Sequence, residues 1–288
     1  MISIFTPTYN RGYILPELFH SLLKQTCQDF EWIIVDDGST DKTSELIDVF
    51  IKKANFPIHY FYKKNEGKHI AINYGAEKAI GEWFFIVDSD DILPEKSVEI
   101  INKYCHAIKD DKRFAGIAGN RAYKSGKIIG NSVSSKYIDM TSANFRKKYI
   151  GDKAEVIKTD LIRQYKFPSF KNEKFMQESV LWLSISNDGY LIRWIKEIIY
   201  IGDYINDGLT KNGKILSKNS PLSKSYAENH IVGSKNIKLI ERIKSCINYY
   251  RYGKYGGLTY KSMYKKSNSK FLSLFAIIIA ISYSIKKK

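Results

Sequence analysis

The first 110 residues alternate between short apolar runs and segments with apolar residues at helical spacing, and this alternation constrains the fold most. Strands are predicted for the apolar runs at residues 2–6, 30–35, 58–62 and 83–87. Helices are predicted between and after them, at residues 13–25, 43–53, 69–79 and 94–108. The second run is almost wholly apolar, as expected of a parallel strand that is covered on both faces. The order therefore predicts an α/β fold with a doubly wound, mostly parallel sheet.

Three polar clusters follow strands of this predicted sheet, at the point where each strand ends. They are Thr6–Arg11, Asp36–Thr40 and Asp88–Asp91. Ligands of open parallel sheets bind beyond the carboxyl ends of the strands. We therefore expect the three clusters to converge on one edge of the sheet and to form one binding site.

The cluster Asp88-Ser89-Asp90-Asp91 places three carboxylates directly after an apolar run. Neighbouring carboxylates repel one another and resist dehydration, and a divalent cation relieves both costs. Oxygen ligands suit Mg²⁺ or Mn²⁺. The alternative is an acidic start to the helix at Pro94 and Glu95, because carboxylates also favour helix N-termini. The residues alone leave both interpretations open.

Positive charge is concentrated at the C-terminus. Residues 211–288 hold 17 of the 46 Lys and Arg residues but 2 of the 30 Asp and Glu residues, a net charge of +15, whereas residues 1–210 carry +1. Such a region favours an anionic partner. Its apolar segment, residues 271–285, lies between lysines and is shorter than the roughly 20 residues that span a bilayer. We expect peripheral contact with an anionic membrane, the alternative being a final helix packed on the catalytic domain.

Nucleic-acid binding is not expected, although tyrosines are interleaved with the basic residues after residue 248. That mixture can stack bases and contact phosphates, but no recognition motif is present and the carboxylate cluster stays unexplained. The three cysteines, Cys27, Cys105 and Cys246, are far apart, which favours a reducing compartment. The N-terminus has neither the basic nor the long apolar stretch of a signal peptide. The expected localisation is cytoplasmic, peripheral at the inner membrane face.

Four motifs, taken in order, resemble the signature of family 2 inverting glycosyltransferases with the GT-A fold. They are Pro7-Thr8-Tyr9-Asn10, Val35–Asp41, Asn65–Lys68 with Asn73, and Asp88–Asp91. The resemblance is continuous over residues 1–110 and patchy to residue 210. It implies a Rossmann-like, GT-A type domain over residues 1–210, with a nucleotide-binding half (1–110) and an acceptor half (111–210). A basic helical extension would follow at residues 211–288.

The resemblance also implies an activity: transfer of a sugar from a UDP-sugar donor to a glycan or lipid-linked acceptor in bacterial surface polysaccharide synthesis. Mn²⁺ or Mg²⁺ held by Asp90 would bridge the donor diphosphate and stabilise the departing nucleotide. Asp37 would accept from the uracil imide, Asp36 would bind the base or orient its loop, and Lys68 would meet the phosphates. The nucleotide-binding residues implied are Thr6, Thr8, Tyr9, Asp36, Asp37, Lys68, Asp88 and Ser89.

An inverting transfer needs a general base to deprotonate the acceptor hydroxyl. Glu178 is the candidate, because it stands where the family often has Glu-Asp before an apolar helix with a Trp. Here Ser179 replaces that Asp, and Asp152 is the weaker alternative base. A glycosyltransferase-like scaffold without catalytic activity is the alternative function.

Overall fold

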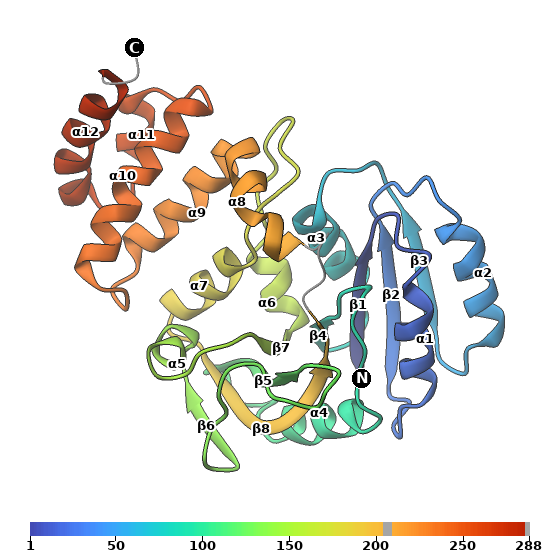
Figure 1. Ribbon diagram of the computed structural model, residues 1–288. Coiled ribbons are helices and arrows are strands. Elements are labelled where there is room, and N and C mark those ends of the chain that lie inside the picture. Colours follow the sequence, from blue (N-terminus) through green and yellow to red (C-terminus); the bar gives the residue numbers. More distant parts are fainter. Residues whose placement is uncertain (204–208, 286–288) are drawn as a thin grey trace. The chain divides into compact units, whose positions relative to one another are not determined.

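The structure is a computed structural model that describes residues 1–203 and 209–285. It consists of two compact units (Figure 1). Unit 1 comprises Met1–Lys166 and Gly189–Tyr204, and unit 2 comprises Phe167–Asp188 and Ile205–Lys288.

A single mixed sheet forms the centre of unit 1. Its strands are β1 (Ile2–Thr8), β2 (Phe30–Asp36), β3 (Ile58–Tyr62), β4 (Trp83–Ile86), β5 (Phe114–Ala122), β6 (Tyr137–Met140), β7 (Lys153–Lys158) and β8 (Leu191–Ile201). They are ordered β3-β2-β1-β4-β7-β5-β8-β6. Strands β1 to β4 are parallel, as are β5 and β8, whereas β7 is antiparallel to β4 and β5 and β6 is antiparallel to β8. The predicted α/β fold with a mostly parallel sheet is confirmed.

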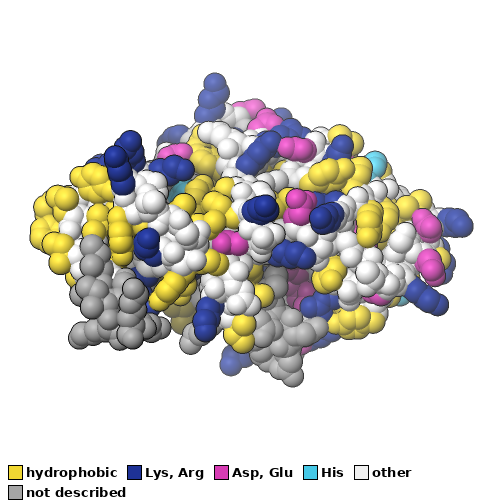
Figure 2. Space-filling view, turned by 90° about the horizontal axis from the view of Figure 1, so that it is seen from above, with side chains coloured by type: hydrophobic (Ala, Val, Ile, Leu, Met, Phe, Trp, Pro, Cys, Tyr) yellow, Lys and Arg dark blue, Asp and Glu magenta, His cyan; other side chains and the backbone are white. Residues whose placement is uncertain are grey.

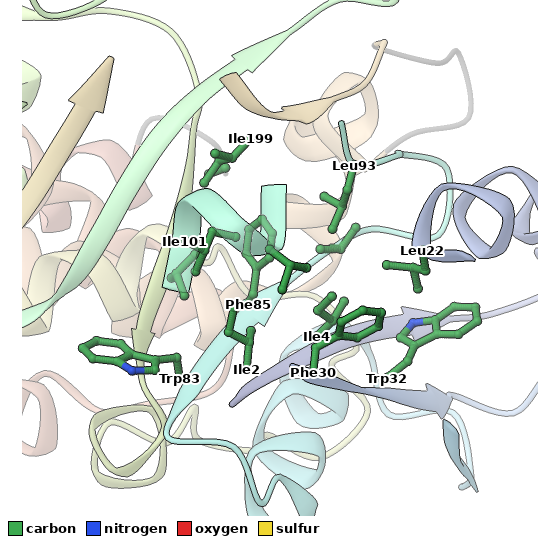
Figure 3. Packing of buried hydrophobic residues seen from close by; sticks show 14 of the residues in the cluster. Ile2, Ile4, Leu22, Phe30, Trp32, Trp83, Phe85, Leu93, Ile101 and Ile199 are labelled. Carbon is green, nitrogen blue, oxygen red and sulfur yellow. The ribbon is translucent and has the colours of Figure 1, made fainter. Parts of the chain in front are cut away.

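Helices cover both faces of this sheet. They are α1 (Leu15–Leu23), α2 (Thr43–Lys53), α3 (Lys68–Lys78), α4 (Ser97–His106), α5 (Ser142–Lys148) and α6 (Thr159–Gln164). Helices α1, α2 and α4 pack on the face that carries Ile4, Trp32 and Phe85, and Figure 3 shows these side chains in one apolar cluster. Helix α3 covers the other face, where a Cβ at Gly75 would collide with the Phe5 ring. Alternate residues of each strand thus enter two separate apolar layers.

The sequence also predicts strands at residues 114–118, 127–129 and 190–201, but it does not predict β6 and β7. Strands β6 and β7 contain Asp139, Lys153 and Glu155, which obscure the apolar pattern of a strand. The predicted strand at residues 127–129 appears as an isolated bridge between Ile128 and Ala122. The antiparallel β7 lies between β4 and β5. The sheet therefore extends beyond β4, the last of the parallel strands that position the polar clusters.

The regular secondary structure of unit 2 is helical among the described residues, and residues 167–178 form no helix or strand. Its helices are α7 (Ser179–Asn187), α8 (Leu209–Asn219), α9 (Pro221–Gly233), α10 (Leu239–Tyr255), α11 (Tyr260–Lys266) and α12 (Lys270–Ile285). A second apolar cluster joins α9 to α12 and includes Val232, Cys246 and Tyr250. Residues 167–188 belong to this unit, so the compact units differ from the division at residue 210 drawn from the sequence. Among the described residues, no helix is both long and apolar enough to cross a membrane.

Candidate functional site

The polar segments after β1, β2 and β4 converge at one edge of the sheet, as the sequence predicts. These three strands are neighbours and run parallel, so their carboxyl ends share that edge. The loops after β1 and β2 are joined directly, because the Asn10 amide donates to Ser39 Oγ at 2.8 Å and the Thr40 amide donates to Asn10 Oδ1 at 2.8 Å. Asn10 has a φ of 54°, a left-handed conformation that asparagine tolerates better than most residues.

Asp36 holds the loop that follows β2. It is buried, and its Oδ1 accepts from the Ser39 amide at 2.7 Å while its Oδ2 accepts from the Tyr60 hydroxyl at 2.9 Å. Burial and the Asp36 carboxylate raise the pKa of Tyr60, so its hydroxyl stays protonated and continues to donate. Both carboxylate oxygens of Asp36 therefore already have protein donors.

Asp37 ties the same loop to the start of α3. Its Oδ1 accepts from Lys63 Nζ at 2.7 Å and from the Glu66 amide at 2.9 Å, and its Oδ2 accepts from the Gly67 amide at 2.7 Å. Gly67 has a φ of 98°, which glycine adopts at low cost, and Lys68 begins the helix after it. Asp37 thus helps to set the position from which Lys68 extends.

The residues predicted after β1 differ in their availability to a ligand. Thr6 is fully buried and its hydroxyl accepts from Trp32 Nε1 at 2.9 Å, so it packs inside the sheet layer. Thr8 Oγ1 is also buried, and no hydrogen-bond partner reaches it in the part of the chain that the structure describes. The Tyr9 side chain is exposed. Of these three side chains, that of Tyr9 is therefore accessible to a bound molecule, whereas those of Thr6 and Thr8 are buried.

Lys68 brings a positive charge to the carboxylate cluster. Its Nζ lies 2.5 Å from Asp88 Oδ1, and the Asp88 side chain keeps 31% of its surface exposed. Burial opposes ionisation of Asp88, but the charge of Lys68, with smaller contributions from Arg121 and Arg11, holds the pKa of Asp88 below its ordinary value. Asp88 is therefore a carboxylate at neutral pH, and Lys68, which was predicted to meet the phosphates of a donor, lies beside it.

Asp90 lacks the compensation that Asp88 receives. Within residues 1–203 and 209–285, no ion pair or hydrogen bond from another residue to its carboxylate is found. Burial and the nearby charge of Asp88 raise the pKa of Asp90, and the charges of Arg11 and Lys68 offset this rise only in part. Ser89 is buried between the two carboxylates. This is the electrostatic setting in which a carboxylate gains from a bound cation.

Asp91 belongs to a buried network that the sequence analysis missed. Its Oδ2 accepts from Arg121 at 2.9 Å and from the Tyr200 hydroxyl at 2.6 Å, and the guanidinium lies 4.1 Å from the Tyr200 ring centroid. Burial and the Asp88 charge raise the pKa of Asp91 to about 7, although Arg121 and Tyr200 act in the opposite direction. A Cβ at Gly202 would collide with this carboxylate, so glycine is needed there. The sequence offered one sign of this network, which is that Arg121 is the only charged residue in β5, a strand made mostly of small and apolar residues.

The two candidate bases belong to different units. Glu178 immediately precedes α7 in unit 2 and has helical backbone angles, and its side chain does not cap that helix. Asp152 precedes β7 in unit 1, and its charge contributes to raising the pKa of the Arg121 guanidinium. Asp152 is thus electrically coupled to the Asp91 network.

The carboxylates after β4 fit a divalent cation that is shared with a phosphate ligand. In the described residues, no three His, Cys, Asp or Glu side chains are grouped to hold a metal by themselves. Mg²⁺ in phosphate-transfer sites is usually held by one or two carboxylates together with substrate phosphates. Asp90, with Asp88 beside it, supplies that number of carboxylates, and burial together with the charge of Asp88 raises the pKa of Asp90.

Comparison with known proteins identifies the family. The family model of glycosyl transferase family 2 matches residues 3–172, more than half of the chain. A Campylobacter jejuni GalNAc(5)-diNAcBac-PP-undecaprenol beta-1,3-glucosyltransferase is 26% identical over 298 residues, covering 97% of this chain and 92% of that protein. The uncharacterized glycosyltransferase RC0461 of Rickettsia conorii is 33% identical over 191 residues, covering 65% of this chain and 30% of that protein. The chain thus spans about a third of the length of that relative.

Solved structures show the same fold. S. aureus TarS 1-349 in complex with UDP-GlcNAc has a TM-score of 0.63 to this structure at 17% identity, covering 88% of this chain and 72% of that chain. The GT-A type fold implied by the four sequence motifs is therefore confirmed. With this fold, with the polar motifs gathered at the carboxyl edge of the sheet, and with a family match over residues 3–172, the chain belongs to glycosyl transferase family 2.

Proposed function

We propose that this protein transfers a sugar from a UDP-sugar donor to a lipid-linked or glycan acceptor, with inversion at the anomeric carbon. The observation that carries the proposal is the charge arrangement after β4, where Asp88 is paired with Lys68 and where, within residues 1–203 and 209–285, the Asp90 carboxylate has no ion pair. The UDP-GlcNAc complex of TarS supports a UDP-sugar donor, and the name of the C. jejuni relative supports a lipid-linked acceptor. The reaction would serve bacterial surface polysaccharide synthesis.

The residues of unit 1 act on the donor. Thr8 and Tyr9, with the loops held by Asp36 and Asp37, bind the nucleoside, while Lys68 stabilises negative charge on the diphosphate. Asp90 would hold a divalent cation, either Mn²⁺ or Mg²⁺, which when bound would supply Lewis-acid stabilisation of the leaving diphosphate. Thr6 supports this site through its hydrogen bond with Trp32.

Glu178 acts on the acceptor. The acceptor oxygen forms a bond to the anomeric carbon on the side opposite the diphosphate, and the hydroxyl proton passes to the Glu178 carboxylate. The bond between the anomeric carbon and the diphosphate oxygen breaks, and UDP leaves with its electron pair. Asp152 is the second candidate for the base because its charge reaches Arg121.

Calorimetric titration with UDP, in the presence and absence of Mn²⁺, tests the donor site. We expect Mn²⁺ to strengthen UDP binding by at least about tenfold, since the cation offsets repulsion between the diphosphate and the carboxylates. GDP and CDP should bind more weakly than UDP. If no nucleotide binds, the alternative of an inactive glycosyltransferase-like scaffold is favoured instead.

A peripheral membrane contact at the cytoplasmic face fits the surface of α12. Its inner side packs against α10 through Leu272 and Ala276, whereas its outer side exposes apolar side chains at helical spacing. These are Phe271, Leu274, Phe275 and Ile278, whose exposed fractions are 68%, 56%, 57% and 70%, respectively. Figure 2 shows hydrophobic side chains together with Lys and Arg over the C-terminal helices at the left of the view.

Vesicle binding tests this surface. Replacing Phe275 and Ile278 by Ser should weaken binding to anionic phosphatidylglycerol vesicles by at least about tenfold, because burying each such side chain contributes roughly 1.5–3 kcal/mol. Changing Leu239 and Ile240 to Ser is the matched control, since both are exposed apolar residues of unit 2 on α10. Equal binding by both double variants in a co-sedimentation assay would contradict the assignment of the surface to α12.

A further inference from the structure

Helix α9 receives its N-terminal cap from a distant residue. The first amides of a helix have no partner within the helix and need acceptors from elsewhere. Ser220 stands at the N-cap position but makes no side-chain cap, and Pro221 has no amide hydrogen to donate. The Glu173 carboxylate instead accepts from the Leu222 amide at 2.8 Å and from the Ser223 amide at 2.7 Å. One carboxylate thus satisfies two helix amides and complements the positive end of the helix dipole.

A second contact joins the same two segments. Gln177 Oε1 accepts from Lys224 Nζ at 3.2 Å, and Lys224 lies on the first turns of α9. Lys224 is itself held by Glu228, whose carboxylate is buried and lies 3.1 Å from the ammonium group. Asn248 of α10 donates to Glu228 at 3.4 Å, which extends the chain of contacts into the helical cluster of unit 2.

These contacts lie on both sides of one segment without helix or strand. Residues 171–178 form no helix or strand. Backbone hydrogen bonds hold the ends of the segment: the Glu173 amide donates to the Phe170 carbonyl, and the Leu181 amide of α7 donates to the Glu178 carbonyl. Phe170 packs against Tyr226 of α9, with ring centroids 6.2 Å apart. Between those ends, the side chains of Glu173 and Gln177 tie the segment to α9. Glu178 follows Gln177 directly and ends this segment.

We propose that Glu173 is a positioning residue, which caps α9 and thereby holds the segment that presents Glu178 to the acceptor. This proposal rests on the proposed role of Glu178 as the general base. It makes the C-terminal helices part of the transfer machinery, in addition to any part they take in membrane contact. Because the donor residues belong to unit 1, loss of the Glu173 cap should affect turnover and leave nucleotide affinity alone.

The test combines Glu173→Gln with Glu178→Gln in the full chain. Gln keeps the shape of the side chain but loses its charge and cannot accept from both amides with both terminal atoms. UDP release is measured with UDP-glucose and a polyprenyl-diphosphate-linked N-acetylgalactosamine oligosaccharide. We expect Glu173→Gln to lower kcat by about tenfold, since small misplacement of a reacting group is costly. The Kd for UDP should stay within about twofold, and hydrogen exchange of residues 171–178 should be faster.

The double variant separates positioning from a general loss of structure. If Glu173 acts through Glu178, adding Glu173→Gln to Glu178→Gln should lower kcat no further. An equal additional loss in that background would overturn the proposal. Glu241→Gln is the matched control, because Glu241 is an exposed carboxylate in the first turn of α10. Its kcat and its exchange pattern should match those of the original chain.

A further variant tests whether Glu173 acts only by stabilising α9 or by connecting α9 to residues 171–178. It provides an N-cap at position 220 in place of the Glu173 carboxylate. Ser220→Asn offers α9 a side-chain cap of its own but no link to residue 173. In the Glu173→Gln background it should leave kcat low, and recovery of kcat would overturn the proposal. Unchanged kcat in Glu178→Gln alone would instead reject the proposed base, while hydrogen exchange would still report whether Glu173 holds the segment.

Discussion

Asp90→Asn is expected to lower kcat for sugar transfer by at least about 10³-fold, and to remove the dependence of UDP binding on Mn²⁺. A factor of 10³ corresponds to roughly 4 kcal/mol of transition-state stabilisation, which is within the range that a Lewis-acid cation supplies. Asn keeps the size of the side chain but removes the negative charge that would hold the cation. Steady-state kinetics and calorimetric titration measure both effects.

The same substitution should leave the fold intact. Burial and the charge of Asp88 raise the pKa of Asp90, so its ionised form costs more free energy in the folded protein than in the unfolded chain. Removing this charge relieves repulsion, and the free energy of unfolding in urea should stay unchanged or rise. Glu95→Gln is the control, since Glu95 is an exposed carboxylate shortly after the cluster. Transfer by Asp90→Asn at the original rate would refute the assignment of the metal to Asp90.

The parallel part of the sheet was predictable because its apolar pattern is local. Helix Thr43–Lys53 and strand Ile58–Tyr62 have the predicted bounds, and β1, β2 and β4 differ from prediction by a residue or two. Buried parallel strands are apolar on both faces, so each strand stands out from the helices around it. Convergence of the polar clusters then followed from topology alone.

The antiparallel strand β7 escaped prediction because its charged residues are accommodated by tertiary contacts. Lys153 is buried at the start of β7, and its Nζ donates to the Asn131 carbonyl at 2.8 Å. Glu155 pairs with Arg146, whose guanidinium lies 3.3 Å away. In sequence these charges indicate a solvated segment, and only the fold supplies the partners that allow their burial.

Three adjacent aspartates also proved to have different surroundings, which spacing could not show. Asp88 is paired with Lys68, and Asp91 is held by Arg121 from a strand 30 residues farther along the chain. In the part of the chain that the structure describes, Asp90 has no such partner. The grouping of residues 167–188 with the C-terminal helices could not be predicted either, because it also depends on contacts between residues far apart in the sequence. Glu173 and the α9 amides that donate to it are about 50 residues apart in the sequence, so the contact leaves no local sequence pattern.

Glu178→Gln is expected to lower kcat by about 10² to 10⁴-fold, the usual contribution of a general base. Gln has the shape of Glu but cannot accept the acceptor proton. The Kd for UDP should change little, because Glu178 belongs to unit 2 and the proposed nucleoside and diphosphate contacts are made by residues of unit 1. Initial rates of UDP release at saturating donor and acceptor measure the loss.

Asp152→Asn is the comparison that decides between the two candidate bases. If Glu178 is the base, Asp152→Asn should cost far less than Glu178→Gln, since Asp152 would contribute to transfer only through its charge near Arg121. The reverse order of effects would assign the base to Asp152. The anomeric configuration of the product, read by NMR from an α-linked donor, checks the inversion that both assignments require. A β-linked product agrees with attack opposite the diphosphate, and an α-linked product would exclude a single displacement assisted by either carboxylate.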